Sequence, residues 1–375
     1  MSLIPQHARL RGRPGFFRSY DQELALFNTR PKLVGVLVIV LIAALMPWVL
    51  TDPLLRTLAT AFVFAIGALG LNIVTGLAGQ VSLGHAFFVG IGAYTAAAIS
   101  GDPDGRTIGF GITFLPVWLI AGGLAAAAAG VLIAPLATRL RGLYLAIVTL
   151  GLVFLGEHIF KEWRSLTGGA GVGRTSAEPV MFGYTFDKDS AFLTSEQNMY
   201  LLMFVLLLIF ALFARNLARS KVGRSFAAVR DRDVAAEMMG INLSRTKLLA
   251  FAISSFYAGC AGALLFTITG FFDPSSFNLL LSVQFIAMVL IGGAGTVSGT
   301  IMGALFISLL PTLTREIPNY VPLISQQVTV TPNVFQLESI LYGLLIVAFL
   351  LFEPRGLFGI WIRSRNYWKS WPFSY

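Results

Sequence analysis

The sequence has few charged residues and a single cysteine, and both shortages narrow the class of protein. Asp, Glu, Lys and Arg together make up 12% of the 375 residues, whereas soluble domains carry about 25%. Hydrophobic residues make up 56% of the chain, and its mean hydropathy is +0.77. These values predict an integral membrane protein. Because Cys260 is the only cysteine, an intrachain disulfide is excluded.

The sequence also lacks a nucleotide-binding motif of the P-loop type. No glycine loop followed by Lys-Ser or Lys-Thr occurs, so the chain is not expected to bind ATP itself. The glycine-rich segment 168–173 resembles such a loop only superficially, and we interpret it as a flexible turn.

Ionisable residues are almost missing from the long apolar runs, although a proton- or sodium-coupled transporter usually carries them there. Those that occur lie near the ends of the runs: Arg56, His85, Glu157, His158 and Glu338. A membrane enzyme would need a nucleophile, a metal cluster or an acid–base pair. Glu157 and His158 are adjacent, so on a helix their side chains diverge by about 100°. This favours interfacial packing over catalysis, and we expect neither an enzyme nor a metal site.

What the sequence does contain is a series of apolar runs long enough to cross a bilayer. They predict an all-α integral membrane protein with a bundle of about ten transmembrane helices, some of them broken by glycine. The third, eighth and ninth runs are short or glycine-rich. The ten runs are Leu33–Leu50, Leu54–Val74, Ala86–Ser100, Phe114–Ala137, Leu143–Phe160, Met199–Ala214, Leu248–Gly270, Leu279–Ile291, Thr300–Leu313 and Phe335–Phe352.

The basic residues predict the orientation of these spans, because cytoplasmic loops carry an excess of Lys and Arg. With both termini in the cytoplasm, 20 of the 27 basic residues and 6 of the 18 acidic ones lie inside. The net charge of +9 is then explained without a nucleic-acid partner. The predicted regions are a basic tail at 1–32, a transmembrane domain at 33–352 with an external loop at 161–197 and a cytoplasmic segment at 215–247, and a cytoplasmic tail at 353–375.

The N-terminal region admits two interpretations. Aromatic and leucine residues recur at roughly helical spacing between Gly15 and Pro31, which favours a short interfacial helix. A disordered basic tail explains the composition equally well. The first apolar run, Leu33–Leu50, spans eighteen residues without a charge, which is too long for the core of a signal peptide, so no cleaved signal is expected.

The stretch Gly67–Ala98 is apolar, crowded with glycine and dotted with polar residues. Because lipid tolerates no unsatisfied backbone, this segment must lie against protein or line a polar cavity. Broken segments of this kind often carry the solute path of transporters, although tight helix packing through small residues explains them as well. A weak repeat, Ala78–Ser82 and Ala294–Ser298, matches at four of five positions. The predicted topology puts both copies on the inside, where an inverted repeat would put them on opposite sides.

The polar and glycine residues of these two copies are our candidates for the solute path. Gly299 and Gly303, by contrast, have the spacing of a helix-packing pair. For His85, a hydrogen bond to the broken backbone is the competing interpretation. The candidates for the solute path are Asn72, Gly79, Gln80, Ser82, His85, Thr296 and Ser298.

Segment 221–241 has helical spacing from Ser225 to Met239, and Gly240 is well placed to end that helix. Phe226, Val229 and Met238 fall near one face. Such a helix between two spans either docks in a groove of another protein or lies as a surface helix under the bundle.

Four motifs together resemble one family, the M-type permeases of branched-chain amino acid ABC importers. They are residues 223–241, which look like the coupling segment of ABC-importer permeases, and residues 72–85, 291–299 and 353–359. The resemblance covers roughly residues 33–360, and the permeases of urea importers are closely similar. It therefore leaves open leucine-type amino acids, other amino acids and urea as the solute.

The resemblance implies a heteromeric importer in a bacterial inner membrane. Its other members would be a second, homologous permease, two cytoplasmic ATPase subunits that bind the ATP, and an external solute-binding protein. No cofactor of the chain's own is implied. The residues expected to contact an ATPase subunit are Phe226, Val229, Arg230, Ala235, Glu237, Met238 and Gly240.

Overall fold

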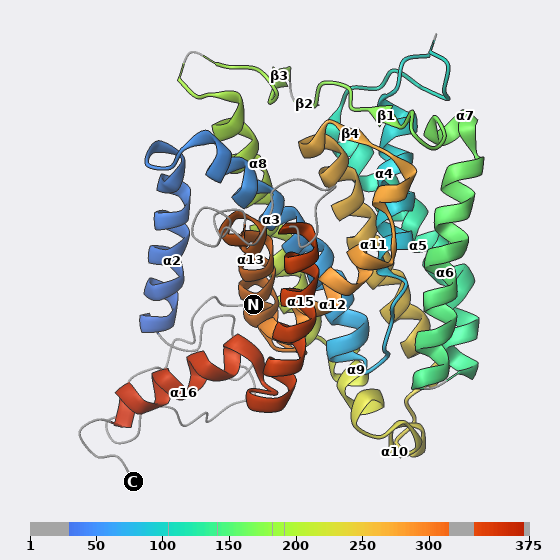
Figure 1. Ribbon diagram of the computed structural model, residues 1–375. Helices are drawn as coiled ribbons and strands as arrows, with labels where there is room; N and C mark the ends of the chain where they lie inside the picture. The colour runs from blue at the N-terminus through green and yellow to red at the C-terminus, as the bar shows by residue number, and fades with distance from the viewer. Residues whose placement is uncertain are drawn as a thin grey trace.

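The computed structural model describes residues 30–314 and 334–370, apart from residues 104, 141, 182 and 191. The predicted tail at 1–32 lies almost wholly outside the described residues. The described chain is mostly helical, with a few two-residue strands, which confirms a helical membrane protein (Figure 1). Six helices are long and apolar enough to cross a membrane: Asp52–Leu77, Leu115–Leu136, Leu143–Glu162, Ser195–Arg219, Leu243–Thr269 and Pro274–Gly292.

Four shorter apolar helices coincide with the remaining predicted runs. They are Lys32–Trp48, His85–Ser100, Val297–Thr312 and Ser339–Phe349. Each is shorter than the roughly 20 residues that a span usually needs. A helix therefore occupies every predicted run, while the number of ten membrane crossings stays a prediction.

Figure 1 shows the described helices and strands in chain order by colour. The N-terminal half comprises α2 Arg30–Leu45, η1 Met46–Trp48, α3 Asp52–Leu71, η2 Asn72–Leu77, α4 His85–Ser100, α5 Leu115–Arg139, α6 Leu143–Glu162, α7 Arg164–Thr167, β1 Arg174–Thr175, β2 Val180–Met181 and β3 Tyr184–Thr185. The C-terminal half comprises α8 Ser195–Arg219, α9 Lys221–Asp231, α10 Asp233–Met238, α11 Leu243–Thr269, β4 Phe271–Phe272, η3 Pro274–Ser276, α12 Leu279–Gly292, α13 Val297–Thr314, α15 Val334–Phe352 and α16 Gly356–Ser370.

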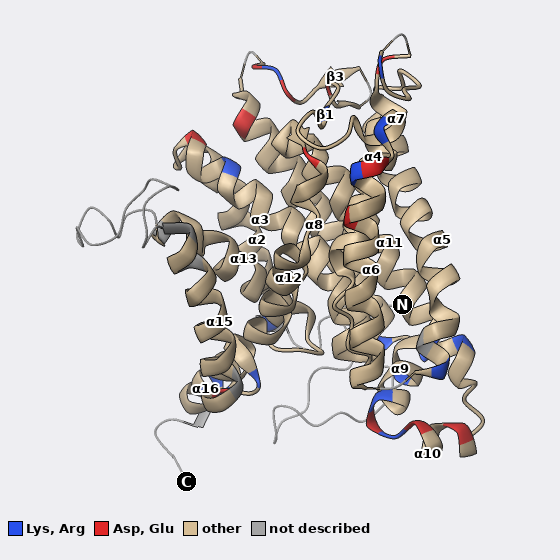
Figure 2. Cartoon of the chain, turned by 45° about the vertical axis from the view of Figure 1, so that its right-hand side comes forward, with Lys and Arg blue, Asp and Glu red and all other residues tan. Residues whose placement is uncertain are grey.

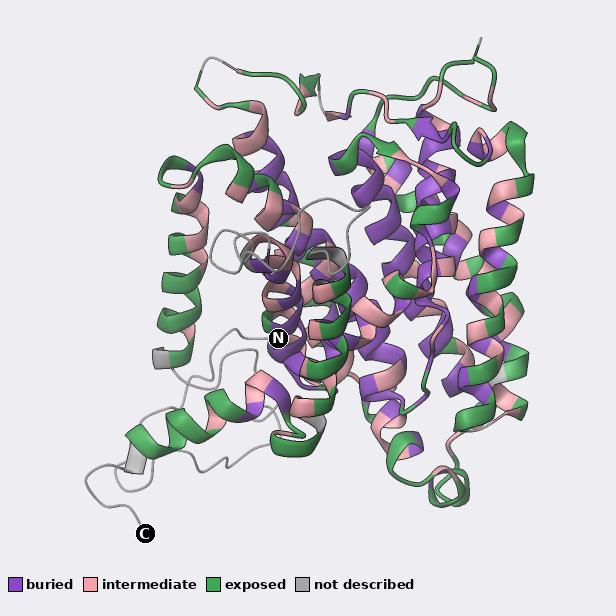
Figure 3. Cartoon of the chain, viewed as in Figure 1, coloured by how far each residue is buried: buried purple, intermediate pink, exposed green. Residues whose placement is uncertain are grey.

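Helices α3 and α11 form the centre of the bundle, and their residues are largely buried (Figure 3). Helix α11 packs against α5, α4 and α3, while α3 also packs against α8 and α13. The outer helices α2, α6 and α15 expose many apolar side chains, as expected for a surface that faces lipid. The interior is thus built around two helices that are buried over most of their length.

Glycine allows the central helices to approach closely. A Cβ atom added at Gly92 of α4 would overlap the backbone of Gly259 on α11, and one at Gly259 would overlap Gly122 on α5. Such contacts between backbones are typical of helix packing in membranes. The hydrophobic effect does not drive helices together there, and small residues allow close van der Waals packing instead. The predicted packing role of Gly299 and Gly303 is confirmed, because a Cβ at either position would collide with the backbone of α12.

The two ends of the bundle differ in structure and charge. The strands, with α7, lie at one end, where β1 pairs with β4 in antiparallel fashion. Helices α9 and α10 lie at the opposite end, where many Lys and Arg residues are found (Figure 2). The glycine-rich segment 168–173 lies at the strand end, and the N–H of Gly171 donates to Asp273 Oδ2 at 2.6 Å. This contact ties the predicted turn to the connection that follows α11.

The prediction of one helix over 225–239 is wrong, because the segment forms two helices, α9 and α10. The break lies at Arg232, whose backbone is extended with φ −156° and ψ 106°. Asp233 follows directly, and its carboxylate accepts the N–H of Val234 at 2.8 Å. An aspartate at this place favours the start of a new helix. Gly240 has φ +84° and follows the last turn of α10, as predicted.

Candidate functional site

The first glycine turn, residues Gly76–Gly79, lies where the helical segment of α3 and η2 ends. The helix widens into the π-helical turn η2, and π-turns of this kind are frequently found at functional sites. The chain then runs without helical structure through residues 78–84 until α4 begins at His85. Gln80 N donates to Val74 O at 2.9 Å, which closes the turn.

Hydroxyl groups from other helices satisfy the backbone of this non-helical segment. The N–H of Leu83 donates to Thr149 Oγ1 on α6 at 2.9 Å, and the N–H of Ala86 donates to Ser282 Oγ on α12 at 3.0 Å. This is the condition under which broken backbone is tolerated at membrane depth. The sequence analysis did not select Thr149 or Ser282, and the only signal was a single Ser or Thr within each apolar run.

His85 is fully enclosed and contacts the backbone of α3. Its Nε2 donates to the carbonyl oxygen of Gly67 at 2.8 Å, and its ring packs edge-on against Phe285 with 4.9 Å between the centroids. The alternative interpretation, a hydrogen bond to backbone, therefore describes its state here. The carbonyl belongs to α3 rather than to the segment beside Gly84.

Asn72 joins the first glycine turn to the second glycine turn, residues Gly293–Thr296, which connects α12 to α13. Its Oδ1 accepts the N–H of Gly295 at 2.7 Å, and its Nδ2 donates to the carbonyl of Thr296 at 3.4 Å. Gly79 and Gly295, which match in the repeat, both have positive φ, of +69° and +82°. The two copies of the repeat therefore meet at the same end of the bundle.

We predict that Asn72→Leu destabilises the permease by about 0.5–1.5 kcal/mol, because the N–H of the half-buried Gly295 loses its acceptor. Asn72 is 1% exposed, so water cannot replace the lost contact. The measurement is the thermal unfolding midpoint of the detergent-solubilised protein. Asn216→Leu, on the exposed surface of α8, is the matched control. Equal midpoints for both variants would contradict the joining role of Asn72.

The other residues predicted for the solute path are placed differently. Gln80 is 6% exposed and Ser82 is 3% exposed, whereas Thr296 is half-buried and Ser298 is exposed. Thr296 Oγ1 donates to the carbonyl of Gly293 at 2.8 Å, within the second glycine turn. Asn72, Gly79, Gln80 and Thr296 thus cluster around the two turns, and His85 lies apart from them.

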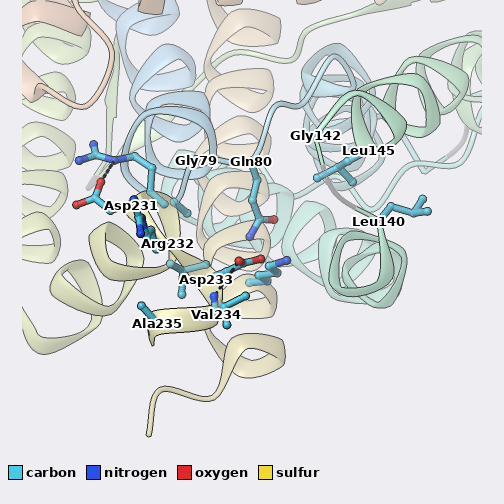
Figure 4. Close-up of a pocket in the computed structure, with 14 residues that line it drawn as sticks. Gly79, Gln80, Leu140, Gly142, Leu145, Asp231, Arg232, Asp233, Val234 and Ala235 are labelled. Carbon is cyan, nitrogen blue, oxygen red and sulfur yellow. Dashed lines mark hydrogen bonds and ion pairs between the residues drawn. The ribbon is translucent and has the colours of Figure 1, made fainter. Parts of the chain in front are cut away.

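Gln80 stands out because neither of its side-chain atoms has a hydrogen-bond partner among the described residues, although both are buried. A buried amide without partners costs free energy, on the order of 1–3 kcal/mol for each group. Its side chain reaches from the first glycine turn towards Asp233 and Val234 (Figure 4). A pocket of about 640 Å³ lies here, lined by Ala78, Gly79, Gln80, Leu140, Gly142, Leu145, Val229, Arg230, Asp231, Arg232, Asp233, Val234, Ala235 and Lys247.

The residues predicted to contact a partner on segment 221–241 divide into two groups. Phe226 is 0% exposed and Val229 is 6% exposed, so α9 packs its apolar face into the bundle of this same chain. In the described chain these two residues contact the permease itself, and their contact with an ATPase subunit stays a prediction. Helix α10 is instead outward-facing, and its exposed residues include Ala235, Glu237, Met238 and Gly240. Met238 and Met239 are each 85% exposed.

No group of three or more His, Cys, Asp or Glu side chains that could hold a metal ion occurs within residues 30–314 and 334–370, with their four gaps. Glu157 instead accepts from Lys161 Nζ at 2.7 Å, one turn along α6. The Glu157 carboxylate thus forms an ion pair along the surface of α6.

Comparison with known proteins identifies a family of transport permeases. The family model described as branched-chain amino acid transport system, permease component, matches residues 54–350. The chain is 31% identical over 347 residues to the high-affinity branched-chain amino acid transport system permease protein LivM of Escherichia coli, covering 88% of this chain and 75% of the relative.

More distant relatives are also permeases. The chain is 24% identical to the permease protein LivH of Escherichia coli, over 67% of this chain and 81% of the relative. It is likewise 24% identical to the ribose import permease protein RbsC of Haemophilus influenzae, over 76% of this chain and 84% of the relative. No solved structure matches the chain significantly.

Proposed function

This chain belongs to the family of permease components of branched-chain amino acid transport systems, and from that premise we propose that it forms part of the membrane path of an ABC importer for leucine-type amino acids. The observation that carries the proposal is the family match over residues 54–350, which includes both glycine turns, α9 and α10. ATP hydrolysis in separate subunits would drive the transport.

We propose that the two glycine turns lie at the cytoplasmic end of that path. Supporting this, they adjoin α9 at the end of the bundle where many basic residues are found. Non-helical backbone that is held by side chains from neighbouring helices is typical of solute sites in transporters. In this arrangement Asn72, Gln80 and Thr296 line the end of the path. The solute contacts them only after the glycine turns move.

The proposed assembly contains a second, homologous permease, two ATPase subunits and an external binding protein. The similarity to both LivM and LivH, which carry the name of the same transport system, supports a pair of related permeases. Helix α10, with Met238 and Met239 exposed, offers the apolar contact for an ATPase subunit. Methionine adapts its shape readily and is common at protein-binding surfaces.

A transport assay with two solutes tests the choice between leucine and urea. Cells that lack this gene and other leucine importers are complemented with it, and uptake of labelled leucine and of labelled urea is compared. We expect leucine uptake that unlabelled isoleucine and valine inhibit. Uptake of urea without uptake of leucine would assign the chain to the urea importers.

Cysteine labelling tests the proposed orientation of the chain in intact cells. In a Cys260→Ser background, Asp187→Cys is expected to react with a membrane-impermeant maleimide, because it lies exposed at the strand end. Asp231→Cys, exposed on α9, is expected to react only after the cells are permeabilised. Labelling of position 231 from outside would reverse the orientation and remove α10 from any cytoplasmic ATPase.

A further inference from the structure

Arg230 lies at the point where α9 meets both glycine turns. Its Nη1 donates to the carbonyl oxygen of Gly76 at 3.0 Å. A Cβ atom added at Gly79 would lie 2.5 Å from Arg230 Cγ and 3.1 Å from its Cα, so the arginine stem covers this glycine. A Cβ atom added at Gly295 would lie 3.3 Å from the same Nη1. One side chain therefore contacts the first glycine turn directly and lies against the second.

The two turns are themselves linked beneath Arg230. Asn72 accepts the N–H of Gly295 and donates to the carbonyl of Thr296. At Gly76 a Cβ atom would overlap Asn72 Oδ1 and the backbone nitrogen of Gly295, so the turns approach as closely as glycine permits. A displacement of α9 is thus passed through Arg230 to a connected pair of turns rather than to one loop.

The other end of this contact is anchored on α9 itself. Phe226 and Val229 are buried against the bundle on the same helix as Arg230. Asp231, the next residue, accepts from Arg230 Nε at 3.2 Å, which orients the guanidinium group. Helix α10, which follows at once, is mostly exposed. A force applied to α10 therefore reaches α9 and then Arg230 with no long loop between them.

Gln80 lies next to this contact. Its amide is enclosed beneath the start of α10 without hydrogen-bond partners among the described residues. Movement of α9 and α10 away from the first glycine turn would open this amide to water or to a solute.

We infer that Arg230 is the positioning residue that ties α9 to the two glycine turns and transmits the movement of the ATPase subunits to the end of the solute path. The inference rests on the proposed function, since it presupposes ATPase subunits at this end of the bundle. It assigns Arg230 an inward contact with the permease, where the sequence alone suggested a contact with the partner.

The test measures movement of the first glycine turn in the assembled importer. Val81→Cys, 44% exposed beside Gln80, is introduced in a Cys260→Ser background, and the rate of thiol labelling is compared between the nucleotide-free and the vanadate-trapped complex. We expect the two rates to differ with Arg230 present and to become equal in Arg230→Gln. Uptake should fall by about 5- to 150-fold, the usual range for the loss of one coupling interaction.

Two variants control for charge and for folding. Arg224→Gln removes the same charge from α9, but Arg224 donates locally to the carbonyl of Arg219, so its labelling rates should still differ. Arg230→Lys keeps a donor within reach of Gly76 but lacks the planar guanidinium group. We expect a reduced but measurable difference between the labelling rates of the two nucleotide states. Should Arg230→Gln fail to assemble, the lysine variant decides, because an unchanged nucleotide response there overturns the inference.

The outcomes separate the inference from the proposed function. If the Arg230→Gln complex shows the same nucleotide-dependent labelling as the parent complex, the inference is overturned, even if leucine uptake is intact. Equal labelling rates in the parent complex would also overturn it. The complex could show nucleotide-dependent labelling that needs Arg230 and yet import no leucine. This result would support the role of Arg230 between α9 and the glycine turns, and it would refute the proposed solute.

Discussion

Replacing Gly79 with leucine is expected to abolish solute uptake while the importer still assembles. Gly79 has φ +69°, a conformation that costs other residues roughly 1–2 kcal/mol. The new side chain would also meet Arg230 at its Cβ and Cα, which cannot move without displacing α9. The first glycine turn and α9 would therefore be forced apart. The measurement is labelled leucine uptake, with recovery of the purified complex measured in parallel.

Two further variants separate the collision at Gly79 from backbone strain alone. Gly171→Leu at the strand end has a similar φ of +76°, yet no atom lies within 4 Å of its added Cβ. We expect it to retain uptake. Gly79→Ala introduces the collision with a smaller side chain and should show an intermediate loss. Normal uptake by Gly79→Leu would remove the first glycine turn from the path and favour the second.

Replacing Phe226 with aspartate is expected to prevent recovery of folded permease. Phe226 is 0% exposed in the isolated chain and belongs to its core. Truncating a buried phenylalanine costs about 3–5 kcal/mol, and burying an unpaired carboxylate adds to that cost. The yield of monodisperse protein after detergent extraction measures the effect. Because the defect lies in the permease, it should appear without any partner subunit.

Met238→Asp is the matched variant on the neighbouring helix, and we expect a different defect. Met238 is 85% exposed, so the permease should fold normally. If α10 contacts an ATPase subunit, the new charge should weaken co-purification of that subunit and reduce ATP hydrolysis stimulated by the solute. Full recovery of the ATPase with Met238→Asp would place the contact elsewhere. Normal yield of Phe226→Asp would contradict its burial in the permease.

Much of the fold follows from the sequence, because the membrane imposes strong constraints on composition. Each of the ten apolar runs contains a helix, since lipid leaves the backbone few alternatives. The interruption near Gly79 and the end of a helix at Gly240 were also predictable, because positive φ favours glycine. Helix lengths were less predictable, and four of the helices are shorter than typical spans.

The candidate site was predicted in part. The residues of the repeat were found from their polarity within apolar surroundings, and the structure brings Asn72 and Thr296 together. Helical spacing alone could not show that the apolar face of α9, with Phe226, packs against the bundle of this same chain. Contacts between segments far apart in sequence, such as Arg230 with Gly76, left no local pattern to find.

The most direct test of the proposed function is ATP-dependent uptake of labelled leucine into proteoliposomes that contain this chain, its homologous permease and the two ATPase subunits. The binding protein is added outside and ATP is enclosed with the ATPase domains. We expect leucine accumulation that requires both the binding protein and ATP. A proton or sodium gradient should not substitute for ATP. Accumulation driven by an ion gradient in the absence of ATP would contradict the account, because the chain would then be a secondary transporter.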